Sequence, residues 1–256
     1  MPAREPLPFV NLHLGAMKID RDGFPFMAIG AVPATVAALR GRRALAAGLG
    51  LAAVALGAFF RDPDRTPDQG SVDDDVVLAP ADGKVMYAGP GQSEVAPDGD
   101  WSQVSIFLSV ADVHINRAPY GGTVTGLEHR PGKFHAAFRA ESAHHNERSE
   151  ITVTRTVDGR TRTVVFRQVV GVLARRVVTR VAVGDEVATG QRIGLMKFGS
   201  RMDVFVPLDA EVTVALGQRV SAGETVIARF ASPVGALTNP IGSGHDVHGG
   251  HEPEST

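Results

Sequence analysis

Two uncharged apolar segments near the N-terminus restrict the fold most strongly. Residues 24–39 and 44–60 contain no charged side chain and are separated only by Arg40-Gly-Arg-Arg43. Their length and composition predict a hydrophobic helical hairpin with a basic turn. Each arm is at or just under the roughly 17 residues that span a bilayer, so we expect membrane association, with a hairpin that dips in rather than crosses. Because residues 1–23 precede the first arm, a cleaved signal peptide is disfavoured.

The remainder of the chain predicts an α+β fold made mainly of antiparallel β-structure. Pro63 and Pro67 break the helical pattern, so residues 61–75 are expected to form a linker. A catalytic-size domain follows over residues 76–230, with little helix and with short β-branched runs bounded by turn residues. These runs are 76–78, 83–87, 104–108, 123–125, 150–154, 163–166 and 176–181.

An internal repeat lies near the end of this domain. The pattern Gly184-x-x-Val187-x-x-Gly190-x-x-Ile193 recurs 33 residues later as Gly217-x-x-Val220-x-x-Gly223-x-x-Val226. Matched positions at one offset indicate a pseudo-twofold pair of half-motifs, similar to the flattened barrel of biotinyl and lipoyl carrier domains. The link between the two halves contains Gly199-Ser200.

Composition excludes several classes of function. The 26 basic and 28 acidic residues give a net charge of -2, so no nucleic-acid partner is expected. The chain has no cysteine, which excludes disulfides, thiolate metal sites and a cysteine nucleophile. Residues 231–256 have the composition of a disordered tail, and the evenly spaced His245, His248 and His251 in it are not expected to form a metal site.

The bond between Gly199 and Ser200 is a candidate site of self-cleavage. A serine hydroxyl can attack the preceding carbonyl and convert the amide to an ester. β-Elimination then releases the upstream carboxylate, and the resulting dehydroalanine hydrolyses to a pyruvoyl group with loss of ammonia. Gly-Ser is also common in ordinary turns, so the pair alone leaves that simpler interpretation open.

Motifs around this bond extend the case beyond one dipeptide. They occur in a fixed order over roughly residues 20–230: Phe59-Phe-Arg-Asp-Pro63, Ala79-Pro-Ala-Asp-Gly-Lys84, Phe107-Leu-Ser-Val-Ala-Asp-Val-His-Ile-Asn-Arg-Ala-Pro119, Asn146-Glu-Arg148, Gly171-Val-Leu-Ala-Arg-Arg176 and Phe198-Gly-Ser-Arg-Met-Asp-Val-Phe-Val-Pro207. Together they resemble the phosphatidylserine decarboxylase proenzyme family, of the shorter prokaryotic type. The resemblance implies a self-cleaved enzyme that converts phosphatidylserine to phosphatidylethanolamine and CO2 through a Schiff base on the pyruvoyl group derived from Ser200.

The resemblance also implies roles for His114 and Asp82. His114 would be catalytic, since a histidine can protonate the α-carbon after loss of CO2 near neutral pH. Asp82 would orient a base during self-cleavage, although an aspartate before glycine is equally common as a turn residue. Long family members carry a second histidine where Arg117 stands, and their Leu-Gly-Ser-Thr cleavage motif ends in Arg201 here. These departures leave the self-cleavage base open between His114 and water.

Cationic side chains in the matched motifs are candidates for binding the substrate. A lipid phosphate or a serine carboxylate suits bidentate arginine. The segment 129–149, which also holds Lys133 and Phe134, is expected to be a lid over the headgroup. The predicted substrate-binding residues are Arg117, Arg148, Arg175, Arg176 and His144.

The expected partners are a phospholipid and a membrane, with the catalytic domain on the cytoplasmic side of the cell membrane. The two cleavage fragments should stay associated, and a homo-oligomer is compatible with the sequence. Two other functions stay open. Met196-Lys197 would suit a biotinyl- or lipoyl-like carrier, and the chain could also be a non-catalytic membrane-anchored β-domain.

Overall fold

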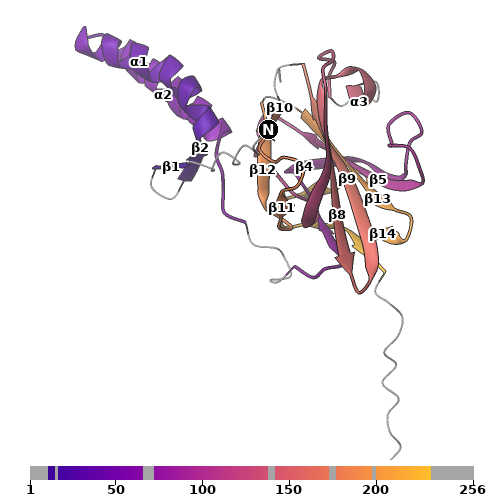
Figure 1. Cartoon of the computed structure of the whole chain (residues 1–256). Coiled ribbons are helices and arrows are strands. Elements are labelled where there is room, and N and C mark those ends of the chain that lie inside the picture. The colour runs from indigo at the N-terminus through magenta and orange to yellow at the C-terminus, as the bar shows by residue number, and fades with distance from the viewer. Residues whose placement is uncertain are drawn as a thin grey trace, which may run out of the picture.

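The structure is a computed structural model, and it describes residues 11–14, 17–65, 72–137, 142–172, 177–197 and 200–231. It consists of an N-terminal helical hairpin and a β domain (Figure 1). The predicted residues Gly199, Arg175 and Arg176 and the predicted tail after residue 231 lie outside the described residues.

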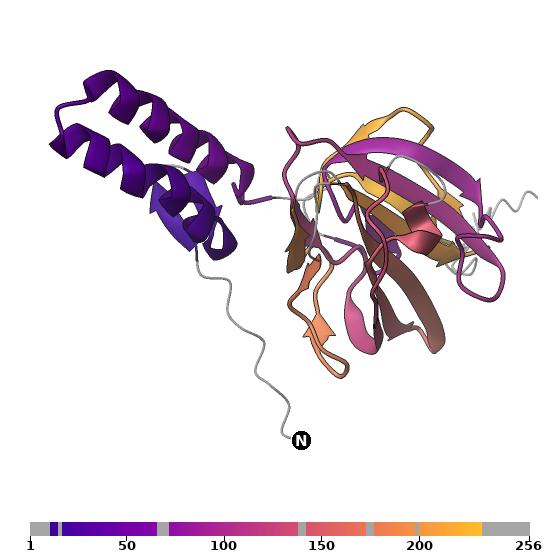
Figure 2. The same cartoon turned by 90° about the horizontal axis from the view of Figure 1, so that it is seen from above.

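The predicted hairpin is present as helices α1 (Phe24–Leu39) and α2 (Arg43–Phe59). They pack side by side and project away from the β domain (Figure 2). Close packing depends on small residues, since a Cβ added to Gly30 would lie 2.9 Å from the Cβ of Ala53. The pair is preceded by the strands β1 (Asn11–Leu14) and β2 (Met17–Asp20) and the 3-10 turn η1 (Arg21–Gly23).

One eight-stranded sheet is the framework of the β domain. Its strand order is β11-β7-β8-β9-β13-β5-β4-β15, and every pairing between neighbours is antiparallel. The bounds are β4 Gly83–Pro90, β5 Trp101–Leu108, β7 Gly122–Arg130, β8 Arg148–Val157, β9 Arg160–Val170, β11 Glu186–Val187, β13 Ser200–Pro207 and β15 Arg219–Val220.

Two three-stranded sheets accompany the large sheet, in the orders β10-β12-β6 and β14-β16-β3. Their strands are β3 Val76–Leu78, β6 Ile115–Arg117, β10 Val177–Thr179, β12 Arg192–Met196, β14 Ala210–Val212 and β16 Val226–Phe230. The sequence repeat runs through β11 and β12 and again through β15 and β16, and its equivalent glycines meet, with a Cβ on Gly223 only 3.7 Å from the Cα of Gly190.

The main hydrophobic core lies between the large sheet and the two small sheets. It takes alternate side chains of β13 (Met202, Val204 and Val206) together with Ile193 of β12 and Ile227 of β16. This period of two is what a strand with one face toward a core requires. The fold is therefore α+β and mainly antiparallel, as expected.

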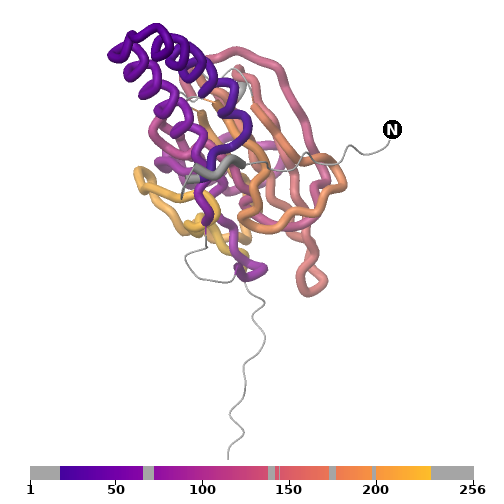
Figure 3. The backbone as a smooth tube through the Cα atoms, turned by 90° about the vertical axis from the view of Figure 1, so that its left-hand side faces the viewer, coloured from indigo at the N-terminus to yellow at the C-terminus, as the bar shows by residue number. Residues whose placement is uncertain are grey.

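A second apolar cluster joins the hairpin to the β domain. Phe59 and Phe60, at the end of α2, pack with Val113, Ile115 and Leu195 on the outer face of the β10-β12-β6 sheet. Figure 3 views the molecule from the side on which the hairpin lies. A third, smaller cluster covers the opposite face of the large sheet. There Phe205 packs with Val95 and with Ala143, which belongs to the short helix α3 (Ser142–His145).

Candidate active site

Ser200 is the first residue of β13 and lies between two partner strands. It pairs with Leu108 of β5 and with Val170 of β9. Its side chain is fully buried, and Oγ has no hydrogen-bond partner among the described residues. Leaving a buried hydroxyl unpaired costs roughly 1–3 kcal/mol. A hydroxyl held in this way is not committed to a hydrogen bond with any of the described residues.

His114 is buried next to the strand that leads to the cleavage site. Its carbonyl accepts from the amide of Met196 at 3.2 Å, four residues before Ser200. Its Nδ1 lies 2.9 Å from the carbonyl oxygen of Asp112. A carbonyl can only accept, so Nδ1 carries the proton and the lone pair is on Nε2.

The environment of His114 keeps the ring neutral. Burial lowers its pKa to about 4, although the carbonyl and the charge of Asp112 act in the other direction. Phe59 provides part of that apolar environment, with its ring centroid 4.3 Å from that of His114. A neutral imidazole with its lone pair on Nε2 can accept a proton at pH 7.

Asp112 is a site residue that the sequence analysis did not select. Its Oδ2 accepts from the backbone amide of Ser109 at 2.8 Å and from the Ser109 hydroxyl at 2.6 Å, and Oδ1 pairs with Arg219. These bonds fix the turn that presents His114. The only signal in the sequence was the Ser-x-x-Asp spacing typical of a hydrogen-bonded turn.

Asp82 lies at the start of β4, two strands away from Ser200. One carboxylate oxygen accepts from the amide of Ala222 at 2.8 Å and the other from Arg65 at 2.8 Å. Neither bond reaches Ser200. Asp82 therefore connects Arg65 of the linker and Ala222 of the repeat to the start of β4. This structural role is compatible with the interpretation of Asp82 as a turn residue.

Arg117 is buried in the connection between the hairpin and the repeat. Its guanidinium donates to the carbonyls of Gly190 at 3.0 Å and Pro63 at 2.9 Å, and it lies 3.8 Å from the carboxylate of Asp62. Burial lowers its pKa to about 10, so it is charged at pH 7. The position of the long forms' second histidine is thus occupied by a cation that already has three oxygen neighbours.

The segment around Asn146 borders the cleavage site from the other side. The Asn146 amide donates to the carbonyl of Val170, the partner of Ser200, at 2.7 Å and to that of His135 at 2.8 Å. Arg148 begins β8 nearby, half-buried, with its pKa lowered by burial and by Arg167. His144 lies in α3, and its side chain is not among those that the structure describes.

Lys197 and Arg201, which flank the predicted cleavage site, are anchored in different layers. Arg201, buried on the face opposite Ser200, donates to Asp203 at 2.6 Å and to Ser105 at 3.1 Å. Lys197 lies 3.6 Å from the carboxylate of Asp22 and 5.2 Å from the ring centre of Phe26 in α1. The hairpin therefore contacts both His114 and the strand that ends before the cut.

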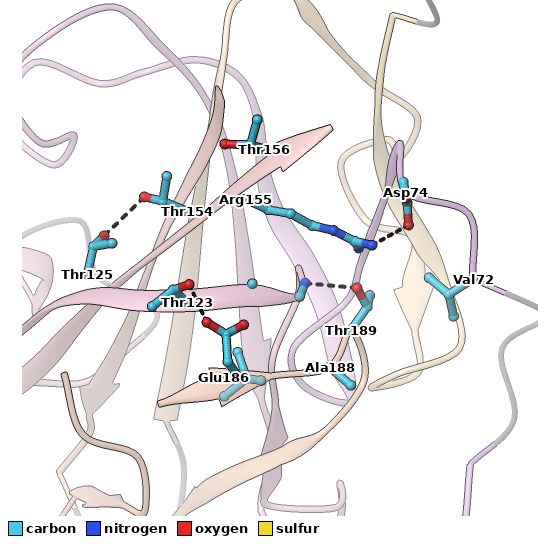
Figure 4. Close-up of a pocket in the computed structure, with 13 residues that line it drawn as sticks. Val72, Asp74, Thr123, Thr125, Thr154, Arg155, Thr156, Glu186, Ala188 and Thr189 are labelled. Carbon is cyan, nitrogen blue, oxygen red and sulfur yellow. Dashed lines mark hydrogen bonds and ion pairs between the residues drawn. The ribbon is translucent and has the colours of Figure 1, made fainter. Parts of the chain in front are cut away.

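A groove in the described part of the chain lies away from these residues. It has a volume of about 750 Å³ and is lined by threonines of β7 and β8, with Arg155 bonded to Asp74 and Thr125 bonded to Thr154 (Figure 4). None of the predicted site residues lines it. It is open and holds no unpaired nucleophile, so we do not assign the chemistry to it.

Comparison with known proteins identifies the family. The pattern of the family described as "Phosphatidylserine decarboxylase" matches residues 54–228, which include Asp82, His114 and Ser200. This chain belongs to the phosphatidylserine decarboxylase family. The match begins inside α2 and ends inside β16, so it takes in the base of the hairpin and the β domain up to residue 228.

Individual relatives lead to the same family assignment. The chain is 47% identical over 171 residues to the phosphatidylserine decarboxylase proenzyme of Solibacter usitatus, covering 67% of this chain and 76% of the relative. It is 43% identical over 213 residues to that of Mycolicibacterium smegmatis, covering 82% and 88%. It is 46% identical over 213 residues to that of Symbiobacterium thermophilum, covering 83% and 95%.

Proposed function

We propose that this chain cuts itself between Gly199 and Ser200, converts Ser200 to a pyruvoyl group and decarboxylates phosphatidylserine to phosphatidylethanolamine. The observation that carries the proposal is the buried hydroxyl of Ser200 at the start of β13, which has no partner among the described residues, inside a chain of this decarboxylase family. The family uses a pyruvoyl group derived from a serine, and the relatives named above are proenzymes.

The self-cleavage requires a base for the hydroxyl proton. In the first step Ser200 Oγ loses its proton, bonds to the carbonyl carbon of Gly199 and displaces the Ser200 nitrogen, which gives an ester. Nε2 of His114 is one candidate for the base, because the Asp112 carbonyl holds the other ring nitrogen as the donor. A water molecule is the other. Asp82 bonds to Arg65 and Ala222, so its part in this step would be indirect.

The position of Ser200 fits the group that would form there. The pyruvoyl group supplies an electrophilic carbonyl and an electron sink for the loss of CO2 from an amino acid. The site around it is dry, since Leu108, Val170 and Met202 are all buried. His114, neutral in the resting chain, would take up a proton at Nε2 and return it to the α-carbon of the product.

The two fragments would remain one folded unit. The smaller chain would begin at Ser200 and keep β13 between β5 and β9, with Ser200 to Pro207 paired to Leu108 to Trp101. It would also carry β14 and β16, which pair with each other, and β16 would stay paired with β3 of the larger chain. Breaking one peptide bond leaves all of these pairings intact.

The hairpin would hold the enzyme on its lipid substrate. Helical residues Arg21–Leu39 are long and apolar enough to cross a membrane, and the family acts on a membrane lipid. The hairpin exposes large apolar side chains on both helices: Ile29, Val32, Val36, Leu39, Leu45, Leu51 and Val54. Insertion from the cytoplasmic side would place His114 and Lys197, at its base, near the lipid headgroups.

Cations at the site would bind the headgroup. Arg117 is engaged by Gly190 and Pro63, so its contribution would be structural, and headgroup binding would fall to Arg148, Arg175 and Arg176, with His144 close in sequence to Arg148. The carrier alternative needs an exposed lysine. Lys197 has 16% of its side chain exposed and is held by Asp22, which disfavours it.

An activity assay with lipid vesicles tests this proposal. The purified protein is incubated with phosphatidylserine vesicles, and phosphatidylethanolamine is quantified by mass spectrometry. We expect product from the native chain and none from Ser200→Ala. Full activity of Ser200→Ala would overturn the assignment of Ser200.

A further inference from the structure

Asn116 carries a buried amide whose donor is unused. The side chain is fully buried in β6, and Oδ1 accepts from Nε2 of Gln168 at 2.8 Å. Nδ2 has no acceptor among the described residues. A buried N–H group without an acceptor costs roughly 1–3 kcal/mol, so its presence requires an explanation.

A chain of hydrogen bonds ends at Asn116. The hydroxyl of Thr179 donates to Oε1 of Gln168 at 2.7 Å, and Gln168 donates onward to Asn116. Oδ1 of Asn116 is thus occupied, and its NH2 group is the unfilled end of this chain among the described residues.

The register of the large sheet places this amide near Ser200. Gln168 pairs with Met202, and two residues later Val170 pairs with Ser200. Gln168 and Ser200 are therefore diagonal neighbours on one face, roughly 7–8 Å apart between Cα atoms. The β10-β12-β6 sheet lies against this face, since a Cβ on Gly194 would be 3.3 Å from Nε2 of Gln168.

Two unpaired groups thus occupy the same layer of the molecule. One is a donor, Nδ2 of Asn116, and the other is the hydroxyl oxygen of Ser200. They are not bonded to each other in the uncut chain. The hydroxyl oxygen moves during self-cleavage, because it becomes bonded to the carbonyl carbon of Gly199.

We propose that Nδ2 of Asn116 donates a hydrogen bond to the Ser200 oxygen as that oxygen leaves, which rests on the proposed function above. In the elimination a base removes the α-proton of residue 200, and that electron pair forms the double bond to Cβ. The bond from Cβ to Oγ breaks, and its pair stays on Oγ, which departs as one oxygen of the Gly199 carboxylate. Negative charge therefore develops on the Ser200 oxygen, which lies in the same layer of the molecule as the unused donor. A preorganised donor in a water-excluded site lowers such a barrier.

The test follows self-cleavage in Asn116→Asp and Asn116→Ala. Asn116→Asp keeps the shape and the Oδ1 acceptor for Gln168 but loses the donor, so it decides the question if Asn116→Ala does not fold. Thr179→Val is the matched control, because it changes the same chain of hydrogen bonds and leaves the donor of Asn116 in place. The chains are made by cell-free translation, sampled over time, denatured with or without hydroxylamine, and weighed intact.

We expect both Asn116 variants to cleave about 10²- to 10³-fold more slowly, as for loss of one such donor elsewhere. The ester should then accumulate, so hydroxylamine should release a small fragment that begins with unmodified serine. A purely structural role would not produce that species. Thr179→Val should cleave at the native rate.

Three results would overturn the inference: native cleavage rates in both Asn116 variants, a folded variant that stays uncut without any hydroxylamine-sensitive bond, or equal slowing in Thr179→Val. A native chain that is never cut at Ser200 would overturn the proposed function and this inference together. Cleavage of the native chain with unaffected Asn116 variants would overturn the inference alone.

Discussion

The ring of Phe59, the last residue of α2, lies 4.3 Å from the ring of His114, centroid to centroid. The helical hairpin and the β domain meet at this pair. A side chain that ends an apolar helix therefore forms part of the environment of His114, whose neutral form is the candidate proton acceptor, and it contributes to the burial that lowers the pKa of His114.

Replacement of Phe59 should change the pH dependence of the decarboxylase. In Phe59→Ala water reaches His114, so its pKa should rise from about 4 toward the ordinary 6.5. The acidic limb of the rate profile should shift upward in pH by about one unit or more. Phe59→Tyr, which keeps the ring, is the control. An unshifted acidic limb in Phe59→Ala would show that Phe59 does not set the environment of His114.

His114 also predicts how stability depends on pH. Its folded pKa of about 4 is below the unfolded value near 6.5, so between these values the unfolded chain binds more protons. The free energy of unfolding should then decrease as pH falls from 6.5 to 4, by at most about 3 kcal/mol from this residue. His114→Gln should lose that part of the slope in urea titrations. Parallel curves for the two proteins would contradict the assigned shift.

The buried pair of Arg201 and Asp203 should be sensitive to removal of one partner. Both side chains are buried, and they lie 2.6 Å apart. Asp203→Asn, or Arg201→Met alone, should destabilise the protein by about 3–5 kcal/mol because one charge is left buried. The double variant Arg201→Met with Asp203→Leu should recover much of this loss. Denaturant unfolding measures all three, and a double variant as unstable as the sum of the single variants would argue against the pair.

The hairpin should depend on Asp20 for its attachment. Both carboxylate oxygens of Asp20 accept from Arg180 at 2.7 Å, in a buried bidentate pair. Asp20→Asn should increase hydrogen exchange in α1 and α2 at least tenfold. Asp64→Asn, at an exposed ion pair with Lys18, is the control and should have little effect. Equal exchange in both variants would show that the apolar cluster alone holds the hairpin.

Local sequence signals predicted the elements well. The uncharged runs 24–39 and 44–60 correspond to α1 and α2 within one residue at each end. Each of the seven predicted β-branched runs overlaps a strand, because alternation and turn residues act over a few positions. The β1–β2 hairpin was not predicted: its strands alternate polar and apolar residues, but each is only four residues long, too short for the alternation to stand out.

Contacts between residues far apart in the chain could not be predicted from the sequence. Asp20 and Arg180 are 160 residues apart, and nothing in either segment indicates the other. Ser200 could be selected from its motif, but the burial that leaves its hydroxyl unpaired depends on β5 and β9 together. Asn116 was missed because an asparagine next to a predicted catalytic histidine is ordinary until the fold buries it.

The intact mass of the purified protein under denaturing conditions tests self-cleavage most directly. We expect two species, of 199 and 57 residues, with the smaller one lighter by one ammonia than a peptide that begins with Ser200. Ser200→Ala should give one full-length mass and a folded chain. A single unmodified full-length mass for the native, folded protein would contradict the central claim.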